Sequence, residues 1–234
     1  MNTQPNTHIK IHNRIAYHQA VHAVAIYLGN KQKQLPAVHF QIVIKTQPRD
    51  DGQQSDRFMR PPGKYTAIVE GGRLIQSLPL SFTEDTLYFS WAQTEECLCA
   101  FEADVINLLA GSLAEAKYIA SRDGEVFTAN LINLNALHFY GGSSDIEVIS
   151  EYLECFIPDK ADRERKLPEL FLAAFGFVNK SSNWRAISTL ADYIRDYPIG
   201  TIPCEDVISL LDSCDAACNG PTNNETLKMT IVGT

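Results

Sequence analysis

Apolar positions recur with two different periods along the chain, and each period predicts a different element. Between residues 13 and 28 apolar side chains occupy most faces of a helical projection, which is typical of a buried helix. We expect Asn13 to cap this helix and Gly29 to end it. From residue 38 to residue 45 apolar residues alternate with mostly polar ones, which predicts a strand with one buried face.

The pattern after this strand predicts two further strands and then mainly helix. A second strand is predicted at Tyr65–Glu70, where Gly71 and Gly72 close it, and a third around Thr86–Trp91. Helical periodicity begins at Glu95 and continues to about residue 120. The intervening stretch 46–64 is polar and contains Pro and Gly, so we expect a mobile loop there.

The C-terminal half has the signals of several shorter helices. Ser144 and Glu147 have the spacing of a capping box, which would open a helix that ends near Phe156. Further helices are expected near 166–179, 183–196 and 203–217. The sequence therefore predicts a mostly helical α+β fold with a small sheet in its N-terminal third. We expect one domain over residues 13–217, a flexible tail at 1–12 and a C-terminal tail at 218–234.

Composition and charge narrow the classes of function. The 234 residues are 45% apolar and 21% charged and have a net charge of −8, which disfavours nucleic acid and anionic membranes as partners. No run of residues has the length and apolarity that we expect of a membrane span, and the polar N-terminus is unlike a signal peptide. The six cysteines form no C-x-x-C pair and are interpreted as reduced thiols. These features predict a cytoplasmic protein.

The stretch "AYHQAVHAV" at residues 16–24 is the strongest candidate for chemistry. His18 and His22 lie four residues apart, so on a helix both side chains can reach one metal ion. The spacing alone is weak evidence, because His8 and His12 repeat it in the N-terminal tail. Two buried histidines with hydrogen-bonded ring nitrogens are the alternative interpretation.

Three motifs in order give this pair a context. The stretch "AYHQAVHAVAIYLG" is followed by "LLAGSLAEA" at 108–116 and by "GGSSDIEV" at 141–148. The series resembles the peptidase domain of the FtsH family of ATP-dependent zinc metallopeptidases, whose motifs are H-E-A-G-H, L-A-G-R-x-A-E and G-x-S-x-D. The segment 184–212 is similar to the helices that close that domain, so the resemblance covers about residues 13–212.

The resemblance implies a metal site and the role of each residue in it. It implies His18, His22 and Asp145 as ligands of Zn²⁺, and Glu115 as an acidic residue close behind them. A carboxylate in that position can accept the other N–H of a ligating imidazole. Without the resemblance, Asp145 would be an acid in the first turn of a helix and Glu115 a solvated helix charge.

The chain departs from the family where catalysis is concerned. Gln19 replaces the glutamate that accepts a proton from the attacking water, and an amide has no useful basicity. Val21 replaces the motif glycine, Ser112 replaces the arginine of the second motif, and no G-x-x-x-x-G-K-[ST] motif is present. We therefore expect a metal-binding, FtsH-like domain in which hydrolysis is weak or lost.

Two alternatives remain at this point. The first is an active zinc peptidase that uses another base, such as Glu115, or whose glutamate has been exchanged for Gln19. The second is a metal-free interaction domain. In each case a flexible peptide or protein partner is expected, and self-association is considered because the family's peptidase domains pack around a ring.

Overall fold

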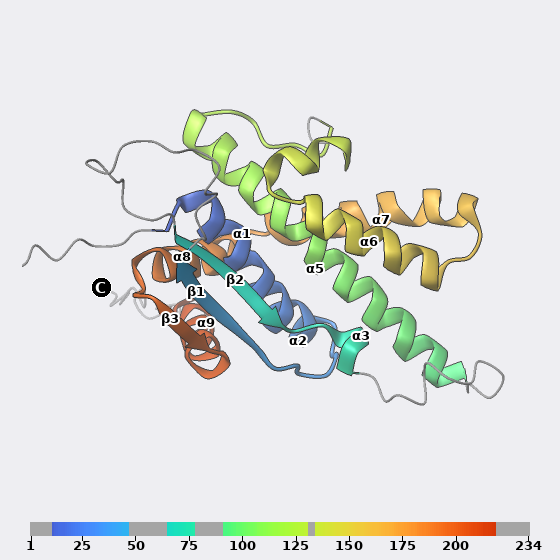
Figure 1. Cartoon of the computed structure of the whole chain (residues 1–234), viewed down its shortest axis with the longest axis horizontal. Helices are drawn as coiled ribbons and strands as arrows, with labels where there is room; N and C mark the ends of the chain where they lie inside the picture. The colour runs from blue at the N-terminus through green and yellow to red at the C-terminus, as the bar shows by residue number, and fades with distance from the viewer. Residues whose placement is uncertain (1–10, 47–64, 78–90, 131–133, 219–234) are drawn as a thin grey trace, which may run out of the picture.

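The computed structural model describes residues 11–46, 65–77, 91–130 and 134–218, and it is mostly helical with one small sheet (Figure 1). This confirms the predicted α+β class with a helical majority. Of the expected tails at 1–12 and 218–234 and the expected loop at 46–64, residues 1–10, 47–64 and 219–234 lie outside the described residues. Ile11 is buried and Cys218 lies in a helix, so these two residues are not part of a tail. The helices are α1 (Asn13–Val24), the π-helix η1 (Ala25–Gly29), α2 (Asn30–Gln32), α3 (Leu74–Ser77), α5 (Trp91–Asp123), the 3-10 helix η2 (Leu134–Tyr140), α6 (Ser143–Phe156), α7 (Lys160–Asn179), α8 (Ser181–Asp196) and α9 (Cys204–Cys218).

The first helix is longer than predicted, and both of its ends differ from the expectation. Its N-cap is His12, whose Nδ1 accepts a hydrogen bond from the Arg14 amide, so the prediction that Asn13 caps the helix is wrong. Helical structure continues through η1 and α2 beyond Gly29. It ends in a Schellman motif in which Gln34, at φ 57°, takes the left-handed position that glycine usually fills.

The sheet has three antiparallel strands in the order β2-β1-β3. β1 (Phe40–Thr46) pairs along its whole length with β2 (Tyr65–Gly71) and over four residues with β3 (Gly200–Pro203). The predicted alternation holds, since Phe40, Ile42 and Ile44 are buried. β2 and β3 are therefore the two edge strands.

The third strand predicted from the sequence, around Thr86–Trp91, lies almost wholly outside the described residues, so that part of the prediction stays untested. Trp91 begins helix α5, and residues 86–90 lie outside the described part of the chain. The actual third strand, β3, was missed because it is only four residues long and ends at Pro203. A strand this short has no alternation long enough to read as period two.

Helix α6 begins without the predicted capping box. Its N-cap is Gly142, which supplies no side-chain cap, and Ser144 already lies in the first helical turn. A Cβ at Gly142 would come within 2.0 Å of the Ser112 hydroxyl on α5. Because only a glycine permits this close approach, contact with α5 fixes the start of α6 upstream of Ser144.

Helices α1 and α5 form the centre of the molecule. α1 packs against α5, α8 and β2, and in Figure 1 it lies behind the sheet and beside the long α5. By length and composition, Glu95–Asp123 within α5 could cross a membrane, which the sequence analysis did not expect. Of its most apolar window, 67% is buried in the protein, as in the core helix of a soluble protein, and buried Asp104, Asn107 and Glu115 lie along it.

Candidate metal centre

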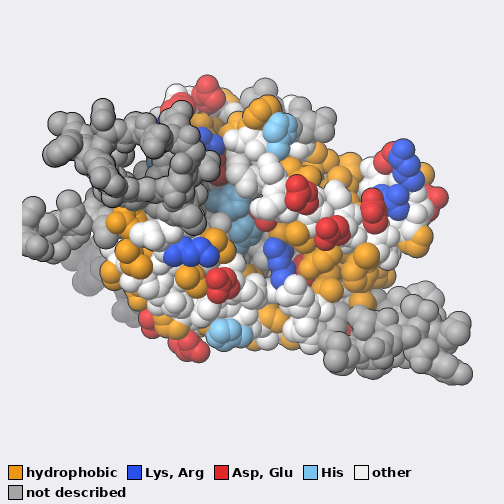
Figure 2. All heavy atoms as spheres, in the orientation of Figure 1, with side chains coloured by type: hydrophobic (Ala, Val, Ile, Leu, Met, Phe, Trp, Pro, Cys, Tyr) orange, Lys and Arg blue, Asp and Glu red, His pale blue; other side chains and the backbone are white. Residues whose placement is uncertain are grey.

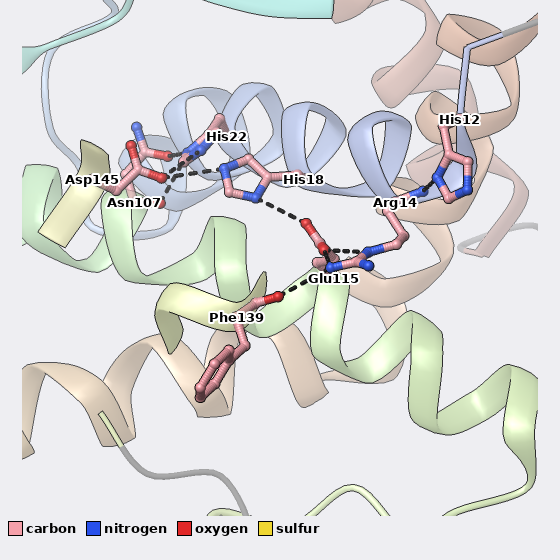
Figure 3. A network of polar contacts seen from close by, with 8 residues as sticks. All are labelled: His12, Arg14, His18, His22, Asn107, Glu115, Phe139 and Asp145. Carbon is pink, nitrogen blue, oxygen red and sulfur yellow. Dashed lines mark hydrogen bonds and ion pairs between the residues drawn. The ribbon is translucent and has the colours of Figure 1, made fainter. Parts of the chain in front are cut away.

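Two histidines of α1 and one aspartate of α6 meet in a buried cluster (Figure 3). The His18 and His22 side chains lie one helical turn apart, and each residue is only 7% exposed. Asp145, in the first turn of α6, places its Oδ2 atom 3.2 Å from His18 Nε2 and 3.6 Å from His22 Nε2. The structure thus brings together the three residues that the motifs predicted as metal ligands.

The distances among these three atoms suit a small tetrahedral ion. Ligands at 2.0–2.1 Å from a tetrahedral zinc ion lie about 3.3 Å from one another. The two separations that involve Asp145 bracket this value, and one ligating atom from each of the three residues lies within 4.8 Å of the others. The cluster could therefore hold a divalent ion and leave one position open.

A glycine of α5 makes room for the cluster. A Cβ at Gly111 would lie 2.7 Å from His18 Nε2 and 2.7 Å from His22 Nε2, where the two nitrogens converge. Real Cβ atoms essentially never approach other atoms this closely. Sequence reasoning missed Gly111, although it lies inside the second motif, because nothing in the sequence places α5 directly against the two rings.

The far nitrogen of His22 is held by α5. Its Nδ1 lies 3.1 Å from the backbone oxygen of Asn107 and 3.1 Å from the Asn107 side-chain oxygen. Both partners are acceptors, so Nδ1 carries the proton and donates it. The lone pair of Nε2 is then free to face the cluster. Asn107 was not predicted from the sequence.

Glu115 lies on the opposite side of His18 from Asp145. Its Oε2 atom is 3.6 Å from His18 Nδ1, a buried nitrogen that has no hydrogen-bond partner. Its Oε1 atom forms an ion pair with Arg14, which also donates to the Phe139 carbonyl oxygen over 3.1 Å. The structure thus places Glu115 behind the His18 ring and supported by Arg14, a residue that sequence reasoning missed.

The two carboxylates make the pocket strongly attractive to a cation. Burial by itself would lower the pKa of His18, but Asp145 and Glu115 outweigh this effect and raise it to about 9. Burial would raise the pKa of each carboxyl, yet contacts with the histidines hold the pKa of Asp145 well below its usual range. The pKa of Glu115 is lowered by His18 and Arg14 against the same burial effect.

Gln19 faces the edge of the sheet. Its Oε1 atom accepts a hydrogen bond of 2.8 Å from the backbone amide of Val69 on β2. Gln19, the two histidines and Asp145 line one cleft of about 590 Å³ between α1, β2 and the start of α6. Histidine side chains are visible at the floor of a hollow in the centre of the face in Figure 2.

The other departures from the family motifs do not enter the cleft. Val21 is fully buried in the hydrophobic core, and Ser112 is buried beside Gly142. His8 and His12, which have the same spacing as His18 and His22, form no second cluster within the described residues. His12 caps α1, and His8 lies outside the described part of the chain.

No protein-family model matches the chain, and no curated protein or solved structure matches it either.

Proposed function

We propose that this protein is an FtsH-like metallopeptidase-fold domain that binds Zn²⁺ through His18, His22 and Asp145 and hydrolyses peptides weakly or not at all. The observation that carries the proposal is the convergence of three ligating atoms from α1 and α6 within 4.8 Å. Two further observations support it: Gly111 leaves space where the nitrogens meet, and Asn107 accepts from His22 Nδ1, so the ring turns its Nε2 atom toward the cluster. Two His and one carboxylate with an open position is the ligand set of many catalytic zinc centres.

Weak hydrolysis follows from the residue beside the first histidine. A zinc ion in such a site acts as a Lewis acid toward a carbonyl group and makes water a better nucleophile. The protein must still supply a group that takes the proton of that water, and the Gln19 amide cannot. Gln19 lines the cleft, and the hydrogen bond from the Val69 amide holds its side chain in place. It therefore keeps the shape that a glutamate would give the site but not the basicity of a carboxylate.

Glu115 is a poor candidate for a replacement base. It lies behind the His18 ring, its Oε1 atom is bonded to Arg14, and its pKa is lowered. A carboxylate in this arrangement is placed to orient the imidazole. The geometry thus favours impaired hydrolysis over an active enzyme that uses Glu115.

A metal-free interaction domain is the second candidate, and one contact favours it. His18 Nε2 and Asp145 Oδ2 lie at hydrogen-bond distance, so the two side chains can satisfy each other without an ion. In that case the cleft would serve only to bind a flexible peptide or a second copy of the chain. We propose a cytoplasmic location and a flexible peptide partner for either candidate.

Metal content and peptide turnover together separate the candidates. The purified protein is dialysed with zinc, and bound zinc is measured in wild type and in the His18→Ala variant. The proposal predicts zinc in wild type, loss of it in the variant, and little turnover of an unfolded peptide by the loaded protein. Equal zinc in both proteins would support the metal-free domain, and rapid zinc-dependent turnover would support an active peptidase.

A further inference from the structure

A second charged group faces the cleft at the end away from Glu115. Arg73, in the turn between β2 and α3, lines the same cleft as His22 and Asn107. Its Nη1 atom is buried and has no hydrogen-bond partner. Buried polar atoms without a partner are rare in proteins, and an unpaired guanidinium N–H is expensive to desolvate. None of the described residues supplies such a partner, so a ligand in the cleft is a candidate for it.

Asp104 of α5 is an acidic residue close enough to feel the charge of Arg73, but it does not hydrogen-bond Arg73 Nη1. Arg73 acts electrostatically on Asp104 of α5. Both Asp104 oxygens, however, accept hydrogen bonds of 3.0 Å from the amides of Leu74 and Ile75 at the start of α3. Asp104 therefore anchors the backbone that follows Arg73, and no hydrogen bond joins it to Arg73 Nη1.

The backbone on the other side of Arg73 is fixed as well. Gly71 and Gly72 both have positive φ values, of 83° and 79°, which a residue with a side chain rarely adopts. A Cβ at Gly72 would lie 2.3 Å from Ile26, so the turn is pressed against η1, the continuation of α1. Arg73 is thus held between two anchored segments, and its position is set by the fold.

The contact between Gly72 and Ile26 shows how far the turn that carries Arg73 lies from His18 and His22. Ile26 follows His22 by four residues, so the turn lies about one helical turn, ~6 Å, beyond the cluster along the helix that α1 and η1 form. An extended peptide spans this length with roughly two residues. A ligand bound at the cluster can therefore place a carboxylate next to Arg73.

We infer that Arg73 is a specificity-determining residue that binds a carboxylate of the peptide whose backbone lies at the metal cluster. The inference rests on the proposed function, because it places the rest of that peptide at the zinc site. A planar guanidinium pairs with a carboxylate through two parallel hydrogen bonds, which is the most selective contact that one side chain can make to this group. The carboxylate belongs either to an acidic side chain or to the C-terminus of a peptide.

Three matched probes test the inference on the zinc-loaded protein. Each is a succinyl-hydroxamate dipeptide, which chelates zinc at one end. The first carries a glutamate side chain and an amidated end, the second carries glutamine and an amidated end, and the third carries glutamine and a free carboxylate end. Dissociation constants are measured by calorimetry for wild type, Arg73→Gln and Arg73→Lys. Arg122→Gln is the control, since Arg122 is an exposed residue near the C-terminal end of α5 that pairs with Asp123.

We expect wild type to bind one or both acidic probes at least about tenfold more tightly than the neutral probe. This preference should fall to near unity in Arg73→Gln, be partly kept in Arg73→Lys and be unchanged in Arg122→Gln. The probe that shows the preference identifies the source of the carboxylate. Equal affinity of wild type for all three probes, or a preference that survives in Arg73→Gln, would overturn the role of Arg73 and leave the zinc site standing. Failure of every probe to bind would overturn the zinc site and this inference together.

Discussion

The side-chain oxygen of Gln19 accepts a hydrogen bond of 2.8 Å from the backbone amide of Val69. This contact joins α1, the helix of His18 and His22, to the edge strand β2, and it holds Gln19, which stands at the position of the general base in the proposed function. A glutamate at this position would accept the same hydrogen bond, because a carboxylate oxygen is also an acceptor. The position can thus be converted from an amide to a base with little change of shape.

Gln19→Glu should raise zinc-dependent cleavage of an unfolded peptide by at least about tenfold, since general-base catalysis typically contributes ~10²–10⁴-fold. The Val69 amide stabilises the anionic form and keeps the carboxylate charged at neutral pH. Initial rates with a fluorogenic peptide measure the effect, and Gln19→Ala is the control that removes the hydrogen bond without adding a base. No gain in a Gln19→Glu protein with full zinc content would mean that more than the base has been lost.

Gly111→Ala should lower zinc affinity by at least about tenfold. The added Cβ would lie 2.7 Å from both ligating nitrogens, so the rings must move from positions that ligand geometry fixes to within ~0.2 Å. The matched control is Gly176→Ala on α7, where a Cβ would meet no other atom within 4 Å. We expect the control to keep its zinc affinity and to gain up to about 1 kcal/mol of helix stability. Unchanged affinity in Gly111→Ala, measured by competition with a chelator, would contradict the placement of the ion.

The motifs pointed to the three residues of the cluster but not to the residues around them, and the reason lies in how α1 and α5 pack. Arg14 meets Glu115, His18 and His22 flank Gly111, and His22 also meets Asn107, so one helix runs antiparallel to the other at steps of four residues. Periodicity within a segment shows which face is apolar. It does not show which residue of a distant helix lies opposite, so Gly111 and Asn107 could not be assigned.

Local signals also failed where tertiary contacts decide the boundaries. Gly29 permits a helix end without forcing one, and the chain stays helical until Gln34 takes the left-handed conformation. The start of α6 is set by the contact of Gly142 with Ser112, which overrides the capping signal at Ser144. The fold class was predictable because the long buried segments dominate it, whereas these boundaries were not.

Glu115→Gln should weaken zinc binding by about 10-fold, at the low end of the usual 10–100-fold effect of residues that orient metal ligands. The substitution keeps the side-chain size but removes the charge that faces His18 Nδ1 and pairs with Arg14. Asp123→Asn is the control, because Asp123 is an exposed acid at the end of the same helix. Titration calorimetry measures both variants. Equal loss in the two would show that only the net charge of the protein matters.

The metal-free protein should lose stability as the pH rises from 6.5 to 9. The fold raises the pKa of His18 to about 9 from 6.5, so its protonated form stabilises the native state. This contribution is fully present below pH 6.5 and is lost as the pH passes 9, and it amounts to up to about 3 kcal/mol. Urea unfolding in the presence of a chelator at several pH values measures the trend. A flat or rising profile would contradict the close pairing of His18 with the two carboxylates.

Zinc should offset this trend over the same range. A protonated imidazole cannot ligate, so zinc must displace the His18 proton, and its affinity rises about tenfold per pH unit below the pKa of that group. Binding to the native state adds stability that grows with affinity. We expect the difference between zinc-loaded and chelator-treated protein to increase from pH 6.5 to 8.5. A difference that does not change with pH would mean that His18 is not a ligand.

The central claim is that His18, His22 and Asp145 hold one ion, and zinc bound per chain tests it most directly. Wild type and Asp145→Asn are dialysed against the same micromolar zinc buffer, and metal and protein are measured in each. Asparagine keeps the shape of the side chain and removes the charge that meets both Nε2 atoms. We expect about one zinc per wild-type chain and a content near that of the buffer in Asp145→Asn. Equal zinc in the two proteins, or none in wild type, would contradict it.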